Sequence, residues 1–533
     1  MSSRGSAWIL AVAGLAGACS MTLELSAVRL VAPWFGTSSV VWTHVIGVVL
    51  LALSVGYWMG ARLSRGANPE RTLGIALLLA AGATAWLPAL AHPVASWFRP
   101  AGIALDEAAE LLQWGSLAAA LVLFLPPTLL LGCAPPLATE ILQRRSDRSA
   151  GDSGGRVLAL STLGSIAGTF STTYLVLPAL GLTRTYLGVG VLLALTGIWS
   201  LVQGRGPTKG ALGILLLPLL VALPVSRSRN PAAPEGWRVL DQAESAYQSI
   251  RIVESLEPDA PFRRLQVNEG LDSFQSVWQP EPGLLPDGYY YNLFVLPVWW
   301  SESAGPWRVF VAGLGAGTAW RVLEGAMPAQ VRLVGTGAEI DPEVVAMGRR
   351  WFDLPASEPD RRVLAGWDAR AALASQVEPF EEIVLDAYAN QMEIPAHLCT
   401  LEFFEEVESH LAPAGWLAVN IGGFGLADPV VESVAGTVAS AFGTRVLAVR
   451  VPFSRNCILF ARRGAEAPTP GSEAWFVSDA GQSERLSALS LEGTWRWFEA
   501  GGIGPILTDD ENPIDALQWE SIRRGRESWI SGH

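Results

Sequence analysis

The stretch VFVAGLGAGT, residues 309–318, decides the fold of the second half of the chain. Four apolar residues typical of a buried strand are followed by glycines at alternate positions, Gly313, Gly315 and Gly317. Such glycines allow a tight turn into a helix and let the backbone approach a ligand closely, while the free N–H groups of the helix start favour polar or anionic atoms. The pattern predicts a nucleotide-type loop, and a tight structural turn is the alternative.

Further apolar runs surround this stretch in both directions. Three lie downstream, at 331–340, 381–388 and 415–423, and helix-like segments at 342–352 and 400–411 separate them. Alternation of this kind predicts a parallel, doubly wound sheet. Two earlier runs, at 247–255 and 263–270, have no helix between them, so we expect a small antiparallel β unit in front of the sheet.

Acidic residues follow the predicted strands at the carboxyl edge of the sheet, where α/β domains bind ligands. Glu339 and Asp341 end the second strand in GAEIDP, and an acid there can accept hydrogen bonds from both ribose hydroxyls of a nucleoside, although a helix cap is also common at this place. Asp368 in AGWDAR could accept from an adenine amino group, and Asp386 ends the fourth strand. Together with the glycines, these acids predict a nucleoside site.

The first half of the chain has a different composition. The 533 residues are 50% hydrophobic and 16% charged, with a mean hydropathy of +0.31, which is too apolar for an ordinary soluble protein. A lipid-spanning helix needs about 20 mostly apolar residues. We expect six spans and a doubtful seventh, at 7–32, 38–61, 72–97, 111–133, 156–180, 185–203 and 210–226.

Charge marks a boundary near residue 230. Residues 1–230 carry 15 basic and 8 acidic side chains, against 22 basic and 42 acidic in the rest. An acidic soluble half argues against nucleic acid as a partner. We therefore expect a transmembrane helical domain at 1–230, a small β domain at 231–300 and a Rossmann-like domain with a C-terminal extension at 301–533.

Arginines in the connecting segments predict the orientation. They lie between the second and third spans and between the fourth and fifth, which places both connections in the cytoplasm by the positive-inside rule. If 210–226 spans the membrane, the C-terminal half lies outside; if it does not, that half is cytoplasmic. Arg227 and Arg229 favour the cytoplasm.

Three features of the sequence leave alternatives open. Glu24 and Arg29 lie within the first span and suggest either a functional intramembrane site or an ion pair near a helix end. The pairs Pro126-Pro127 and Pro135-Pro136 suggest broken or kinked helices. The acidic run at 509–511 suggests a solvated loop or a part of the substrate mouth. The four scattered cysteines predict neither a disulfide framework nor a metal site.

The ordered motifs resemble the spermidine synthase (polyamine aminopropyltransferase) family. They are ESAYQSIRIVES, VAGLGAGT, GAEIDP, AGWDAR, IVLDAY followed by IP, and TLEFFEEVESHLAPAGWLAVNI, which together cover about 238–460. The N-terminal spans resemble the membrane-fused bacterial branch of that family. The resemblance implies a methyltransferase-type Rossmann-like fold, a bacterial inner-membrane location with a cytoplasmic C-terminal domain, and a homodimer.

The same resemblance implies roles for individual residues. Gly313, Gly315 and Gly317 would form the cofactor loop, with Glu339 at the ribose and Asp368 at the adenine, and Asp341 is a further candidate cofactor-binding residue. Asp386 would be the catalytic acid, hydrogen-bonded near Tyr291, and Tyr247 and Gln248 would bind the amine. The co-substrate would be decarboxylated S-adenosylmethionine, with no tightly bound cofactor.

Departures from the family pattern leave three functions open. The glycine loop has Ala316, and the loop after Asp386 has Ala389, where the family carries acids; the family's LDG turn reads Asn268-Glu269-Gly270. A membrane-anchored aminopropyltransferase is the leading hypothesis. An S-adenosylmethionine-dependent methyltransferase on the same fold and a non-catalytic nucleoside- or polyamine-binding membrane protein are the alternatives.

Overall fold

The computed structural model describes residues 4–35, 39–98, 108–146, 149–204, 233, 235–245, 247–257, 261–267, 274–301, 303–356, 358–388, 394–476 and 483–530. The chain divides into two compact units, a helical one made mainly of residues 1–232 and a second one made mainly of residues 271–533. The predicted span 210–226, the Asn268-Glu269-Gly270 turn and Ala389 lie outside the described residues.

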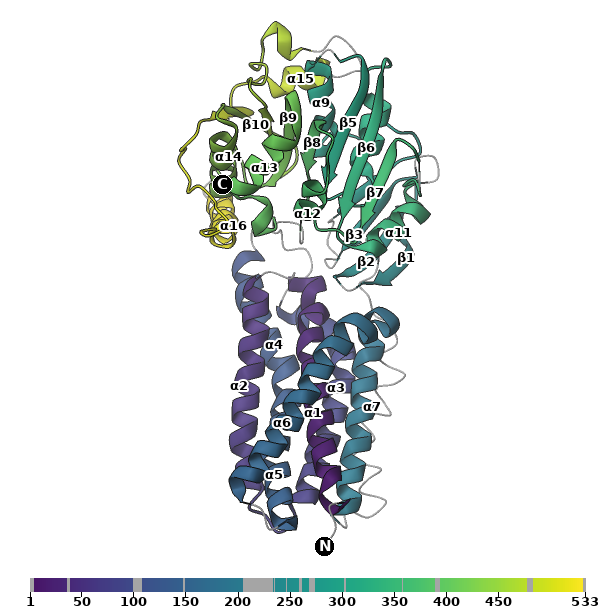
Figure 1. Ribbon diagram of the computed structural model, residues 1–533, viewed down its shortest axis with the longest axis vertical. Coiled ribbons are helices and arrows are strands. Elements are labelled where there is room, and N and C mark those ends of the chain that lie inside the picture. Colours follow the sequence, from purple (N-terminus) through teal and green to yellow (C-terminus); the bar gives the residue numbers. More distant parts are fainter. Residues whose placement is uncertain are drawn as a thin grey trace. The chain divides into compact units, whose positions relative to one another are not determined.

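Long helices build the first unit (Figure 1). They are α1 (Arg4–Phe35), α2 (Ser39–Leu63), α3 (Pro69–Phe98), α4 (Ala108–Gly132), α5 (Ala134–Arg145), α6 (Ala150–Ser171) and α7 (Leu177–Gln203), with a π-helical turn at Thr172–Val176. Helix α1 packs against α6, α2 against α4 and α3 against α7. The α1–α6 contact is close enough that a Cβ on Gly164 would lie 1.9 Å from the carbonyl oxygen of Gly14, as expected where small residues let membrane helices approach.

Five helical stretches among the described residues are long and apolar enough to cross a membrane, by length and composition. The last, Ala150–Gln203, is 54 residues long and includes both of the predicted spans at 156–180 and 185–203. It is not one straight helix, because Gly181 has non-helical backbone angles, φ 70° and ψ 174°. The Pro126-Pro127 pair lies inside α4, whereas Pro135-Pro136 lies in the first turn of α5, just after the break at Cys133.

The second unit contains two sheets. Four strands form a small sheet in the order β1-β2-β3-β4: β1 (Trp237–Glu244), β2 (Ser249–Ser255), β3 (Arg263–Val267) and β4 (Ser276–Trp278). Strand β3 pairs antiparallel with both β2 and β4. This is the predicted β unit, with β4 as a short strand that the sequence analysis did not identify.

Eight strands form the main sheet, in the order β12-β10-β11-β9-β8-β5-β6-β7. They are β5 (Gly305–Ala312), β6 (Val331–Glu339), β7 (Arg361–Ala365), β8 (Phe380–Leu385), β9 (Leu411–Gly422), β10 (Val446–Arg450), β11 (Asn456–Arg462) and β12 (Trp495–Phe498). Five neighbouring strands, β9, β8, β5, β6 and β7, pair in parallel. Strand β11 pairs antiparallel with both β9 and β10. This arrangement confirms the predicted methyltransferase-type Rossmann-like sheet.

Helices cover both faces of this sheet (Figure 1). They include α10 (Thr318–Ala326), α11 (Pro342–Trp351), α12 (Ala369–Ala374), α13 (Leu401–His410), α14 (Pro429–Phe442) and α16 (Ile514–Ile530). Along β5, Phe310 and Ala312 belong to one hydrophobic cluster, and Val309 and Val311 belong to the other. Both faces of the central strand are therefore buried, which explains why the sequence reads as a continuous apolar run rather than an alternating one.

Candidate active site

The glycine loop connects β5 to α10 as predicted. Gly313, Gly315 and Gly317 have φ values of 86°, 56° and 93°, a region that residues with a side chain rarely adopt. A Cβ on Gly313 would lie 2.4 Å from the carbonyl oxygen of Asp386, and one on Gly315 would lie 2.5 Å from the hydroxyl of Ser276. Both glycines are therefore needed for the backbone angle and for the space.

Two N–H groups of this loop already have partners. The N–H of Gly315 donates to Glu339 at 2.9 Å, and that of Ala316 donates to the hydroxyl of Ser276 at 2.8 Å. These two contacts hold β4 and the end of β6 against the turn. Gly315 and Ala316 precede α10, so their N–H groups are not those of the helix start, and the predicted use of the N–H groups at the helix start stays a prediction.

Glu339 lies at the end of β6 with both oxygens engaged. One accepts from Gly315 and the other from the N–H of Asp341 at 3.0 Å. Burial raises the pKa of Glu339 to about 7 despite these hydrogen bonds. Asp341 is fully buried and caps α11 by accepting from the N–H of Glu343 at 3.0 Å, so the helix-cap alternative holds for one of its oxygens.

Asp386 lies directly after β8, next to the glycine loop. One carboxylate oxygen accepts from the amide of Asn420 at 2.8 Å and the other accepts from the hydroxyl of Tyr290 at 3.1 Å. Burial raises the pKa of this carboxyl to about 7, and the two hydrogen bonds oppose the shift. Such a group can change protonation state near neutral pH, which a proton acceptor requires.

The predicted tyrosine partner of Asp386 was wrong by one residue. Tyr290 makes the contact, whereas Tyr291 donates to the main-chain oxygen of Gln275 at 2.9 Å. The two rings stack with centroids 4.2 Å apart. Burial, followed by the nearby Asp386 charge, raises the pKa of both tyrosines, so both hydroxyls keep their protons. Tyr291 therefore packs against the ring that contacts the acid, and the catalytic role predicted for Tyr291 stays a prediction.

Two asparagines that the sequence analysis missed complete the surroundings of Asp386. Asn420 on β9 is buried, and its side-chain oxygen accepts from the amide of Asn456 on β11 at 2.8 Å. Because its oxygen is occupied by Asn456, the Asn420 amide group is held with its N–H₂ toward Asp386. Asn420 was detectable as a lone polar residue at the end of an apolar strand; Asn456 was not, because its role depends on the pairing of β9 with β11.

Asp368 follows β7 at the same edge of the sheet and is partly exposed. One of its oxygens accepts from the N–H groups of Arg370 and Ala371 and so caps α12. The other lies 2.8 Å from Nε2 of His397. Partial burial acts to raise the pKa of Asp368, but the His397 and backbone hydrogen bonds outweigh it and hold the pKa below its usual value.

The two residues predicted to bind the amine lie in the turn between β1 and β2. Tyr247 is half exposed and Gln248 is buried. The hydroxyl of Ser245 accepts from the N–H groups of both, at 3.0 and 2.9 Å. The turn is therefore held by Ser245, and the amine-binding role of Tyr247 and Gln248 stays a prediction.

Known proteins similar to this chain include a protein of Bifidobacterium longum described as a probable polyamine aminopropyl transferase. It is 29% identical over 299 residues, which are 53% of this chain and 62% of the relative. Polyamine aminopropyltransferase 1 of Streptomyces coelicolor is 26% identical over 505 residues, covering 87% of this chain and 86% of the relative. No family model matches the chain.

Solved structures similar to the chain include a probable spermidine synthase from Corynebacterium glutamicum. The two are 21% identical, with a TM-score of 0.39, over 51% of this chain and 91% of that one. The spermidine synthase of Thermotoga maritima is 13% identical with a TM-score of 0.35, over 57% of this chain and 98% of that one.

Proposed function

Because the chain is a relative of the polyamine aminopropyltransferases, that is, of the spermidine synthase family, we propose that it is a membrane-anchored aminopropyltransferase. It would move an aminopropyl group from decarboxylated S-adenosylmethionine to a primary amine. The observation that carries the proposal is the environment of Asp386: a partly buried carboxylate with a pKa of about 7, held by Tyr290 and Asn420 beside the glycine loop.

The proposed reaction needs one proton acceptor. The nitrogen of the amine attacks the aminopropyl carbon bonded to the sulfonium, the C–S bond breaks, and its electron pair neutralises the sulfur to give 5′-methylthioadenosine. The attacking amine binds as an ammonium ion but must lose a proton to become a nucleophile. Asp386 attracts the cation and accepts that proton, and binding both substrates in one geometry supplies much of the remaining acceleration.

Tyr290 and Asn420 keep Asp386 suited to this role. Both donate hydrogen bonds to the carboxylate, which oppose the rise in pKa that burial causes. Without these donors the carboxyl would stay protonated at higher pH and could not accept a proton from the amine. Their positions therefore bring the pKa of this partly buried acid close to neutral pH.

The nucleoside part of the substrate fits the neighbouring strand ends. Glu339 at the end of β6 would accept from the ribose hydroxyls in place of the N–H groups of Gly315 and Asp341, and Asp368 after β7 would accept from the adenine amino group. Ala316 offers no carboxylate to the cationic end of the aminopropyl chain, and it is fully buried. Among the described residues, Asp386 and Glu339 are acids beside the glycine loop that would hold cationic groups.

The function is tested by amine-dependent release of 5′-methylthioadenosine from the full-length protein in detergent. Decarboxylated S-adenosylmethionine is combined in turn with 1,3-diaminopropane, putrescine, cadaverine and agmatine. We expect Asp386→Asn to lower turnover at least about 100-fold, on the scale of general-base contributions, with nucleoside binding retained. Asp360→Asn, which removes an acid paired with Arg332 on the surface, is the matched control and should leave turnover unchanged.

Other outcomes would replace the proposal. Wild-type turnover in the Asp386→Asn protein would remove Asp386 from the mechanism. Methylation of an acceptor by intact S-adenosylmethionine, without amine-dependent release of methylthioadenosine, would support the methyltransferase alternative. The proposal also requires the second unit on the cytoplasmic side, where these substrates occur, and reporter fusions after Gly206 and after His533 test that side.

A further inference from the structure

Asp368 and His397 form a pair at the edge of the sheet where the proposed nucleoside site lies. Nε2 of His397 is 2.8 Å from the Asp368 oxygen that does not cap α12. A carboxylate only accepts hydrogen bonds, so Nε2 carries the hydrogen. The side chains are 36% and 49% exposed, so the pair is open on one side rather than enclosed in the core.

His397 is held by a segment far away in the sequence. Residues 507–512, here called the C-terminal clamp, bond to the backbone around His397. The main-chain oxygen of Leu507 accepts from the N–H of Leu401 at 2.7 Å, and the side-chain amide of Asn512 donates to the main-chain oxygen of Ala396 at 2.7 Å. The clamp thus fixes the chain on both sides of His397.

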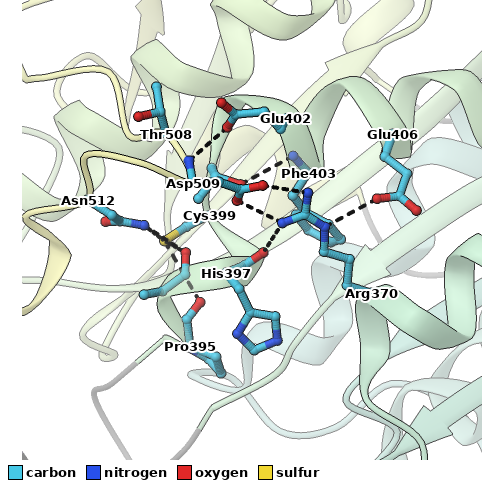
Figure 2. A network of polar contacts seen from close by, with 12 residues as sticks. Arg370, Pro395, His397, Cys399, Glu402, Phe403, Glu406, Thr508, Asp509 and Asn512 are labelled. Atoms are coloured by element: carbon cyan, nitrogen blue, oxygen red, sulfur yellow. Dashed lines mark hydrogen bonds and ion pairs between the residues drawn. The ribbon is translucent and has the colours of Figure 1, made fainter.

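Arg370 connects the clamp to the segment that carries Asp368 (Figure 2). Its guanidinium makes two parallel hydrogen bonds to the carboxylate of Asp509, both 2.8 Å long, and a third to Glu406 at 3.3 Å. The main-chain oxygen of His397 accepts from Arg370 at 3.3 Å, while the imidazole ring points away from the guanidinium. Arg370 lies two residues after Asp368, so one arginine ties both halves of the pair to Asp509.

Asp509 is itself fixed by two further contacts. Its carboxylate accepts from the hydroxyl of Thr400 at 2.7 Å, and its N–H donates to Glu402 at 2.9 Å. Bidentate arginine–carboxylate pairs fix geometry as well as charge. The acidic run at 509–511 is therefore more than a solvated loop, because its first residue joins α12, the start of α13 and the turn that carries His397.

We propose that His397 is a positioning residue for the nucleobase and that the C-terminal clamp is part of the nucleoside site. This rests on the proposed function in so far as an adenine nucleoside is the ligand. A carboxylate oxygen can accept two hydrogen bonds, so the Asp368 oxygen that His397 holds still has one position for the adenine amino group. His397 fixes the direction in which this Asp368 oxygen can accept. Hypoxanthine carries an oxygen where adenine carries the amino group, so it would place an acceptor against the Asp368 oxygen and could not donate to it.

The test measures binding of 5′-methylthioadenosine and of its hypoxanthine analogue, 5′-methylthioinosine, to the full-length protein by calorimetry. For His397→Ala we expect about tenfold weaker binding of methylthioadenosine and an adenine preference reduced about tenfold, on the scale of a hydrogen bond to a charged group. Asp509→Asn should weaken binding about threefold with a smaller loss of preference. In turnover assays both changes should raise KM for the nucleoside substrate and leave kcat unchanged.

Two variants serve as matched controls. Glu466→Gln breaks a bidentate pair with Arg445 in which the acid has the same 43% side-chain exposure as Asp509. His410→Ala removes the other histidine of the second unit among the described residues. Neither should change nucleoside affinity or base preference, and His397→Gln, which keeps an N–H donor, should recover part of the preference.

The outcomes separate this inference from the proposed function. Wild-type affinity and preference in His397→Ala would overturn the inference, and so would an equal loss for both nucleosides accompanied by a lower unfolding temperature, which indicates a structural role alone. Wild-type protein that binds neither nucleoside also overturns it. Protein that shows the expected His397 effects but no aminopropyl transfer would support the inference and remove the proposed reaction.

Discussion

Asp386 and Asp368 are the same amino acid at the same edge of one sheet, yet their surroundings differ. Asp386 is partly buried between Tyr290 and Asn420, which both donate to it, and desolvation at this place raises its pKa to about 7. Asp368 is partly exposed, caps a helix and pairs with His397, and its pKa is lowered. The first acid can exchange a proton at neutral pH, whereas the second stays ionised and can serve as a fixed acceptor. Position at the sheet edge alone therefore does not define a role.

After Asp386→Asn itself, the largest expected effect comes from removing a donor to Asp386. Tyr290→Phe should lower turnover about tenfold to a hundredfold, because a hydrogen bond to a charged group contributes roughly 1.5–3 kcal/mol. Tyr291→Phe should lower it less than about threefold, because that hydroxyl donates to Gln275 instead. Steady-state kinetics of the two variants show which tyrosine acts with Asp386. A larger loss in Tyr291→Phe would support Tyr291, the tyrosine predicted from the sequence.

The pH dependence of turnover sharpens the contrast between the two acids. Asp386 must be ionised to accept a proton, so kcat at saturating nucleoside should fall as the pH drops through about 7, approaching tenfold per unit below that value. The lowered pKa of Asp368 keeps that group ionised over the same range. A kcat that is constant from pH 5.5 to 8 would show that Asp386 does not act as the base.

A third acid extends the comparison to stability. Glu382 in β8 is fully buried; Trp307 donates to one of its oxygens at 2.8 Å, and the other has no hydrogen-bond partner among the described residues. Burial raises its pKa to about 8. The unfolded chain ionises this group near pH 4.3, so its contribution to stability is fully present below about that pH and is lost as the pH rises to about 8.

Glu382→Gln should remove this loss. We expect the unfolding temperature of the variant, followed by tryptophan fluorescence, to exceed that of the wild type by several degrees at pH 8.5 and to match it near pH 4.5. Replacing the exposed acid Asp509 should have a smaller effect of the opposite sign. Asp509→Asn should lower the free energy of unfolding by about 1 kcal/mol or less at neutral pH. Equal unfolding temperatures of wild type and Glu382→Gln at pH 8.5 would contradict the raised pKa of Glu382.

The sequence predicted the parts of the site that depend on local pattern. Apolar runs that end in glycines or acids located the glycine loop, Glu339 and Asp386. The tyrosine was misassigned because Tyr290 and Tyr291 lie in a 3₁₀ helix, Tyr290–Val295, where neighbouring side chains point about 120° apart and no strand or helix period distinguishes them. The roles proposed for these residues in binding and catalysis stay predictions.

Contacts between distant segments were beyond the reach of local pattern. Asn456 acts through the register of β11 on β9, and Asp509 reaches Arg370 across 139 residues. Strands β10, β11 and β12 carry no motif, so the antiparallel end of the sheet was not predicted. In the helical unit, composition indicated the spans, but the non-helical backbone at Gly181 depends on packing as well as on residue type.

The contact between Ser276 and the glycine loop has a consequence for how such proteins can evolve. The Ser276 hydroxyl occupies the space that a side chain at position 315 would fill, and it also accepts from Ala316. A substitution at Ser276 is therefore compatible with the fold only if the glycine loop can accommodate the new side chain, and a substitution at Gly315 only if residue 276 leaves room for it. The small sheet and the glycine loop, forty residues apart, would be inherited as one unit, and an exchange of β domains between distant relatives would need the matching loop.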